Sequence, residues 1–224
     1  MSIRIALVDE NQFEVLLIAD ALIKKGIEVT HLWHSYSNPV PAFASKVPDV
    51  LMMSIGEEAI HAVTIAETMR RKFPHLGLVL VTDTPDLRLL GISENELPNG
   101  VQVILRSSVR DLHVLSRAIH DSVELSKIQS SLTWVTGKSF TDDEAFISTI
   151  QALTLVQIQT LRLVAQGRSN VEIARIRFVT EKAVEHTITR ILQALKITTN
   201  PLNNSRVLLS REYYRWVDVA KHSH

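Results

Sequence analysis

The sequence predicts an α/β domain with a parallel sheet, followed by a smaller all-helical domain, in a chain of 224 residues. Short runs of Val, Ile and Leu alternate with helix-like segments five times between residues 3 and 124, which is typical of a helix-flanked parallel sheet. Beyond residue 150, apolar residues recur at helical spacing. Acidic and basic residues are also distributed unequally on the two sides of residue 150. Residues 1–150 contain 13 Lys and Arg against 19 Asp and Glu, and residues 151–224 contain 11 against 5.

Five segments of the first part are predicted strands. Each is short, and most are rich in Val, Ile and Leu, as expected for parallel strands covered on both faces. Helices between such strands predict right-handed crossovers. The strand segments are residues 3–8, 28–32, 50–53, 78–81 and 101–105.

Helix-like segments follow the strands. One runs from about residue 57 to residue 72 and ends before Pro74, and a last one follows Arg110. The first ends near Gly26, a residue type common just past a helix end. We expect its apolar face to be the one that carries Phe13, Leu16, Leu17 and Ala21.

The composition limits the class of protein. The chain has no cysteine, which excludes disulfides and thiolate metal sites and suits a reducing cytosol. No apolar run reaches membrane-spanning length, and no secretory signal is visible. We therefore expect a cytoplasmic protein. The basic second part suggests that only this part meets a polyanion, although chance segregation of charge between two domains is the alternative.

The first part resembles the receiver domain of bacterial response regulators over residues 1–124. The resemblance rests on IRIALVDEN at 3–11, PDVLMMS at 48–54, FPHLGLVLVT at 73–82 and GVQVILRSSVRDL at 100–112. It implies a (βα)5 fold with a phosphorylation site at the carboxyl ends of the strands. In that family an acidic pair binds magnesium, an aspartate accepts the phosphoryl group, and a Ser or Thr and a lysine engage the phosphate.

This sequence departs from the family at the phosphorylation site. Asp9 and Glu10 match the acidic pair and Thr82 matches the hydroxyl, but Ser54 occupies the phosphoacceptor position and Arg106 replaces the lysine. An acyl phosphate needs a carboxylate, and a serine hydroxyl is a weak nucleophile without an activating base. We interpret the pocket as vestigial and expect Arg106 to pair with Asp9 or Glu10. Retained phosphate chemistry is the alternative.

The second part has the pattern of a helix-turn-helix. Thr154 with Gln157, and Ser169 with Glu172, fit capping boxes at two helix starts, and Gly167 fits a helix end. A short helix from about residue 170 is followed by a tight turn and by a longer helix that Thr180 caps. This longer helix is predicted to bury Val184, Ile188, Ile191, Leu192 and Leu195.

The same segment resembles the LuxR/FixJ/NarL type of DNA-binding domain, through LTLVQIQTLRLVAQG at 153–167, SNVEIA at 169–174 and TEKAVEHTITRIL at 180–192. In that family a fourth helix, expected here at about 205–217, mediates dimer contacts. A receiver followed by this domain is also the family's usual order. We therefore predict a receiver-like domain at 1–124, a linker at 125–150 and a helix-turn-helix DNA-binding domain at 151–224.

The recognition helix is predicted to turn its polar residues toward DNA. Glu185 stands where the family usually has a lysine, and it either accepts a hydrogen bond from cytosine N4 or repels a phosphate. Thr187 and Ala194 also replace a common histidine and lysine. The candidate DNA-binding residues are Ser169, Arg175, Arg177, Thr180, Lys182, Glu185, His186, Thr189 and Arg190.

The sequence thus predicts a transcriptional regulator that binds double-stranded DNA as a homodimer without phosphorylation. We expect no enzymatic activity, no cofactor, no metal and no membrane partner. The alternative is an interaction protein that does not bind DNA and titrates an intact regulator by heterodimerisation. A small-molecule or protein ligand on the helix 4–strand 5–helix 5 face of the receiver-like domain is one hypothesis for control, and constitutive dimerisation is another.

Overall fold

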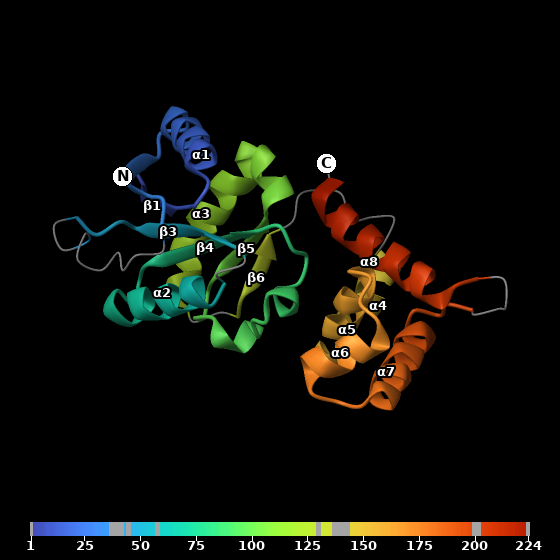
Figure 1. Ribbon diagram of the computed structural model, residues 1–224. Coiled ribbons are helices and arrows are strands. Elements are labelled where there is room, and N and C mark those ends of the chain that lie inside the picture. Colours follow the sequence, from blue (N-terminus) through green and yellow to red (C-terminus); the bar gives the residue numbers. More distant parts are fainter. Residues whose placement is uncertain are drawn as a thin grey trace. The chain divides into compact units, whose positions relative to one another are not determined.

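The computed structural model describes residues 2–35, 43, 46–56, 59–128, 131–135, 144–198 and 203–222. The chain forms two compact units (Figure 1). The N-terminal unit consists of Met1–Asp83 and Leu90–Ser139, and the C-terminal unit of Thr84–Leu89 and Phe140–His222. Each unit has its own hydrophobic core. Within the described residues, no helix combines the length and the apolar character needed to cross a membrane.

The N-terminal unit is built on a six-stranded parallel sheet with the strand order β2-β1-β3-β4-β5-β6. This confirms the predicted α/β class. The sixth strand was not predicted: it lies in the expected linker and pairs with β5, with Gln102 opposite Thr133. The strands are β1 (Arg4–Val8), β2 (Glu28–Trp33), β3 (Val50–Ile55), β4 (Gly77–Thr82), β5 (Gln102–Leu105) and β6 (Thr133–Val135).

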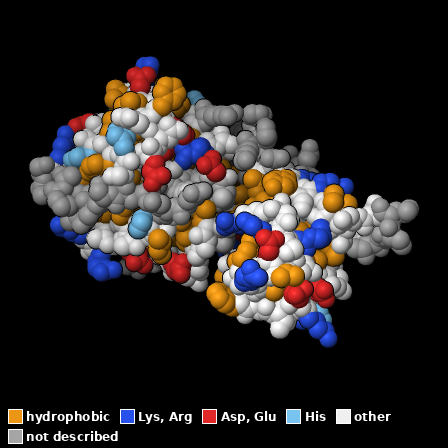
Figure 2. Space-filling model, viewed as in Figure 1, with side chains coloured by type: hydrophobic (Ala, Val, Ile, Leu, Met, Phe, Trp, Pro, Cys, Tyr) orange, Lys and Arg blue, Asp and Glu red, His pale blue; other side chains and the backbone are white. Residues whose placement is uncertain are grey.

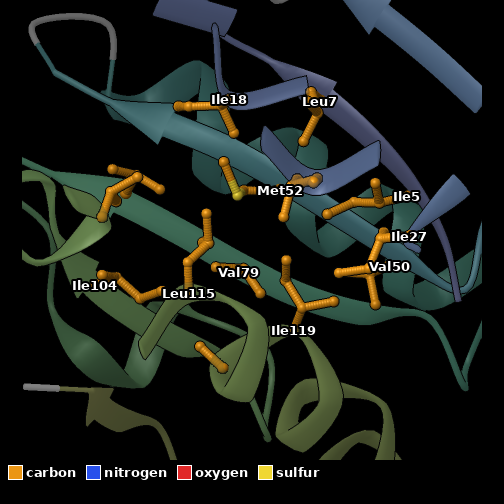
Figure 3. Close-up of a cluster of buried hydrophobic side chains, with 14 of the residues drawn as sticks. Ile5, Leu7, Ile18, Ile27, Val50, Met52, Val79, Ile104, Leu115 and Ile119 are labelled. Carbon is orange, nitrogen blue, oxygen red and sulfur yellow. The ribbon is translucent and has the colours of Figure 1, made fainter. Parts of the chain in front are cut away.

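Helices cover both faces of this sheet. Helices α1 (Gln12–Lys24) and α3 (Leu112–Lys127) pack on one face, where alternate strand residues meet them in a continuous core (Figure 3). Helix α2 (Ala59–Lys72) lies on the other face (Figure 1). Ile5, Leu7, Val50, Met52, Val79 and Ile104 supply the strand side of the core that α1 and α3 cover.

The prediction of which apolar face α1 buries is wrong. Val15, Ile18, Ala19 and Leu22 are the buried residues of α1. Phe13, Leu16 and Leu17 point outward and are 72%, 50% and 55% exposed. The reason is that α1 is apolar on both sides, so its sequence pattern alone does not decide which side meets the sheet.

The segment between β4 and β5 also differs from the receiver pattern. All of its residues are described, and it forms two short 3-10 turns, Leu87–Leu90 and Glu94–Glu96, instead of an α-helix. Pro85 and Pro98 flank these turns, and Gly91, which follows the first turn, has a positive φ that takes the backbone out of the helical conformation. The expected helix 4–strand 5–helix 5 face therefore has no helix 4, and β6 covers the outer edge of β5.

The C-terminal unit is all-helical in its described part beyond residue 143. Its core joins α5, α6, α7 and α8 through buried residues that include Leu161, Ile173, Ile188 and Trp216. The helix predicted at 205–217 is observed and continues to His222. The helices are α4 (Glu144–Gln151), α5 (Leu155–Ala165), α6 (Asn170–Arg177), α7 (Glu181–Ala194) and α8 (Ser205–His222).

Candidate nucleic-acid interface and receiver pocket

The predicted receiver pocket lies where the carboxyl ends of the central strands meet. Asp9 follows β1, Ser54 lies near the end of β3, Thr82 ends β4 and Arg106 follows β5. Parallel pairing places these strand ends at one edge of the sheet. Asp9, Ser54 and Thr82 are buried, whereas Glu10 is exposed.

Arg106 occupies the centre of this pocket. Its Nη1 lies 3.2 Å from Asp9 Oδ2 and 2.6 Å from Glu14 Oε1, and its Nε lies 3.3 Å from Asp83 Oδ2. Its Nη2 donates a hydrogen bond to Ser54 Oγ. One guanidinium thus bridges three carboxylates and the hydroxyl that stands at the phosphoacceptor position.

The surrounding carboxylates stabilise the charged form of Arg106. Burial alone lowers the pKa of its guanidinium, but the hydrogen bond to Glu14 and the charges of Asp9, Glu14 and Asp83 outweigh it. The net effect raises the pKa of Arg106 above its ordinary value. A guanidinium has no acceptor and cannot act as a base, so Arg106 does not activate the Ser54 hydroxyl.

Two members of this cluster were missed by the sequence reasoning. Glu14 lies in the first turn of α1, and Asp83 directly follows Thr82 at the end of β4. The rule that polar residues at strand ends converge would have found Asp83. Glu14 required knowledge of which face α1 turns toward Arg106. Among the described residues, no group of three or more His, Cys, Asp or Glu is arranged to hold a metal ion.

The helix-turn-helix is formed by α6, a short turn and α7. Ser169 Oγ accepts from Glu172 N at 3.2 Å, and Glu172 Oε2 accepts from Ser169 N at 3.0 Å, so the predicted capping box is present. Thr180 Oγ1 accepts from Ala183 N at 3.2 Å and caps α7. Because Thr180 is exposed, the N-terminal end of α7 lies at the surface of the C-terminal unit.

Helix α7 has one buried and one exposed face. Val184, Ile188 and Ile191 are buried in the core of the C-terminal unit, as predicted, whereas Leu192 and Leu195 are only partly buried against it. The exposed polar face is opposite, at the spacing i, i+3, i+4, i+7, i+8 that places residues on one side of a helix. It carries Lys182, Glu185, His186, Thr189 and Arg190.

The nine candidate DNA-binding residues differ in one respect. All except Arg177 are exposed. The Arg177 side chain is half-buried, and its Nη1 donates to Thr160 Oγ1 on α5 at 2.7 Å. Arg177 therefore ties the end of α6 to α5.

A further basic residue, Arg206, was not singled out in the sequence. It lies in the first turn of α8, and its Nη1 donates to Asn170 Oδ1 at 2.7 Å. Its Nη2 donates to the Arg168 carbonyl. Arg206 thus holds the turn that precedes α6, where Ser169 lies. These contacts join residues more than 30 positions apart, so no local pattern in the sequence indicates them.

Comparison with known proteins identifies the type of C-terminal domain. Residues 151–201 match the family described as bacterial regulatory proteins, luxR family. The C-terminal unit carries a LuxR-type helix-turn-helix domain. The matched residues of this LuxR-type domain include α5, α6 and α7. No curated protein matches the chain.

Solved structures resemble the chain over almost its full length. A complex of the two-component response regulator RcsB with DNA is 16% identical, with a TM-score of 0.51, and the match covers 96% of this chain and 98% of that chain. A structure of two RcsB dimers bound to two parallel DNAs is 14% identical, with a TM-score of 0.53 and the same coverage. At these identities the likeness shows the fold: a receiver-like α/β domain followed by the LuxR-type domain.

Proposed function

We propose that this protein is a transcriptional regulator that binds double-stranded DNA through its LuxR-type domain, as a homodimer and without phosphorylation. The exposed polar face of α7, fixed by the buried stripe of Val184, Ile188 and Ile191, carries the proposal. A capped helix with one polar face is the element that helix-turn-helix domains place in the major groove. RcsB, which has the same fold, has been solved bound to DNA.

Electrostatics support binding to a polyanion. Lys182 and Arg190 are exposed on α7, and Arg175 is exposed on α6. Each can neutralise one phosphate and release its counterions. The exposed Glu185 lies between them on the same face of α7, so we infer that it reads a cytosine amino group and favours selective over tight binding.

The position of Arg106 supports control without phosphorylation. The pocket already holds a cation, hydrogen-bonded to the Ser54 hydroxyl and paired with Asp9. A magnesium ion and a phosphoryl group would have to displace this guanidinium, and no carboxylate stands at position 54 to accept the phosphoryl group. We infer that the N-terminal unit stays in one state when phosphoryl donors are present.

The exposed face of α1 supports the homodimer. Four large apolar side chains of this helix are at least half exposed, and Figure 2 shows hydrophobic side chains over α1. A helix that is apolar on both faces is normally covered on both. The exposed residues are Phe13, Leu16, Leu17 and Ile23.

The charges at the two ends of α1 fit a second copy of the chain. Glu10 is exposed just before α1, and Lys24 and Lys25 are exposed at its end. A two-fold axis across the middle of α1 places the acidic end of each helix against the basic end of the other. The same axis brings the two apolar stripes together, so we propose that α1 pairs antiparallel with α1 of the partner.

Selection from a random double-stranded DNA library by the intact chain tests this function. A regulator enriches one motif with two half-sites about one helical turn apart, or a multiple of it. The Glu185→Lys variant should then shift the preferred base or raise the affinity. The alternative, a non-DNA-binding protein that heterodimerises with an intact regulator, is favoured by the acidic Glu185, and it predicts no enriched motif.

A further inference from the structure

Phe178 has a backbone conformation that phenylalanine rarely adopts. It ends α6 with φ 54° and ψ 45°, in the left-handed region, and its N–H bonds to carbonyls of the helix. Glycine holds the corresponding position after α1 and α5, at Gly26 and Gly167, whereas Lys196 holds it after α7 with φ 54°. A bulky side chain in this region is strained by its Cβ, whereas glycine is not. Stability alone would therefore favour glycine at position 178.

The side chain of Phe178 adds a second cost. It is 95% exposed, so its ring contributes almost nothing to the core of the C-terminal unit. A residue that is both strained and unburied conflicts with the fold at two levels, and such conflicts concentrate at functional positions. Ile176, two residues earlier, is 50% exposed.

These two residues line an open groove of about 440 Å³ in the C-terminal unit. Its lining comes from α5 and from the end of α6: Gln159, Arg162, Leu163, Ile176, Arg177 and Phe178. It thus combines an apolar wall with two guanidinium groups, and no carboxylate is among these described lining residues. Phe and Arg are residue types enriched at the centres of protein–protein interfaces.

We propose that this groove, which we call the Phe178 groove, binds an acidic segment of another protein. A bulky apolar side chain of the partner would lie against Phe178, and an adjacent carboxylate would pair with Arg162. Arg162 Nη1 donates to the Leu89 carbonyl of the same unit at 2.5 Å, and Arg177 Nη1 to Thr160 Oγ1, so both guanidinium groups are held in place before a partner binds. Pre-positioned cations cost less to order on binding.

A peptide fits this groove better than the DNA backbone does. A phosphate chain offers charge but no side chain to cover the apolar wall of Leu163, Ile176 and Phe178. The exposed polar residues of α7 are absent from the lining. The groove is therefore a surface separate from the recognition face of α7, and it goes beyond the proposed function because it requires no DNA.

The test uses the full chain and a displayed library of random short peptides. Enriched peptides should carry a bulky apolar residue next to Asp or Glu, and a fluorescein-labelled member should bind about tenfold more weakly to Phe178→Gly. The Arg162→Gln variant, which keeps a donor for Leu89, should weaken binding similarly, and the control Val207→Ser, exposed on α8, should not. Enriched peptides without acidic residues, or binding unchanged in Phe178→Gly, would overturn the proposal.

Two further measurements separate this role from a structural or DNA-binding one. Phe178→Gly relieves the backbone strain, so the Tm of the variant should rise, by about 4 °C. Its affinity for the selected DNA should stay within about twofold of the wild type, since the lost contact is not to DNA. A lower Tm would make Phe178 a structural residue, and a tenfold loss of DNA affinity would assign it to DNA; either result contradicts the proposal.

Discussion

Arg106 donates a hydrogen bond through Nη2 to the hydroxyl of Ser54, and the same guanidinium lies 2.6 Å from Glu14. A side-chain cation thus fills the space where a receiver domain assembles its metal and its phosphoryl group. The charge is permanent, because a guanidinium stays protonated at any accessible pH, and the surrounding carboxylates raise the pKa of Arg106 further. The pocket consequently resembles an internal ion cluster more than a switch.

Replacing Arg106 with alanine should destabilise the N-terminal unit by about 2 kcal/mol, because it leaves Asp9 and Glu14 facing each other without a cation. Adding Mg²⁺ should then raise the Tm of the variant and leave that of the wild type unchanged. Thermal unfolding with and without Mg²⁺ measures both effects. Arg106→Lys, which keeps the charge, is the matched control, and an alanine variant as stable as the wild type would show that the cluster contributes nothing.

Asp49 should make stability depend on pH. The hydrogen bond from Arg4 lowers the pKa of Asp49, against an opposing effect of burial. The stabilisation is therefore present above the unfolded pKa of about 3.9 and is lost as pH falls through the folded pKa. Both side chains are about a third exposed, so Asp49→Asn should cost only about 0.5–1 kcal/mol at pH 7.

Denaturant unfolding of the wild type and of Asp49→Asn over a pH series checks this sign. The difference in free energy of unfolding should be constant from neutral pH to about pH 5 and shrink as pH falls below the unfolded pKa and through the lower, folded pKa of Asp49. A difference that grows in acid would mean that the carboxyl group is stabilised in its protonated form.

The α1 face should control the oligomeric state. Leu17→Glu places a charge in the middle of the exposed apolar stripe and should convert a dimer into a monomer. Light scattering on the eluting full-length protein measures the mass. Ile60→Glu, on the exposed side of α2, is the control and should remain dimeric.

A charge exchange tests the antiparallel arrangement of α1 within that dimer. Glu10→Lys should weaken the dimer through repulsion by Lys24 and Lys25 of the partner copy, and adding Lys24→Glu should restore it. A dimer that tolerates Leu17→Glu, or a double variant no stronger than the single one, would place the interface elsewhere.

Lys182→Ala should weaken DNA binding about equally for all sequences if this exposed lysine at the start of α7 contacts a phosphate, as we propose. The slope of log affinity against log salt should fall by about 1, the value for one lost phosphate contact. Fluorescence anisotropy with the selected DNA and an unrelated duplex measures this. A loss confined to the selected sequence would instead make Lys182 a base-reading residue.

Some features were predictable because one local signal determined them. The helix starts at Thr154, Ser169 and Thr180 follow from side chains that cap backbone N–H groups, and these contacts form within four residues. The buried strands β3 and β4 follow in the same way from continuous apolar runs.

Other features depended on packing that no local signal records. Helix α1 has apolar residues on two faces, so only the sheet decided which face it buried. Strand β6 has three residues and forms only because the edge of β5 is available to it. In the pocket, the pairing of Arg106 with Asp9 was expected from the strand ends, whereas Glu14 entered through the orientation of α1.

Titration of the intact, unphosphorylated chain with its selected duplex tests the central claim most directly. Binding should be measurable at low salt, weaken steeply as salt rises, and be the same after incubation with acetyl phosphate and Mg²⁺. Mass spectrometry of the same sample should find no added phosphoryl group. Failure to bind any duplex in nearly salt-free buffer, or binding that appears only after a phosphoryl group is attached, would contradict the account.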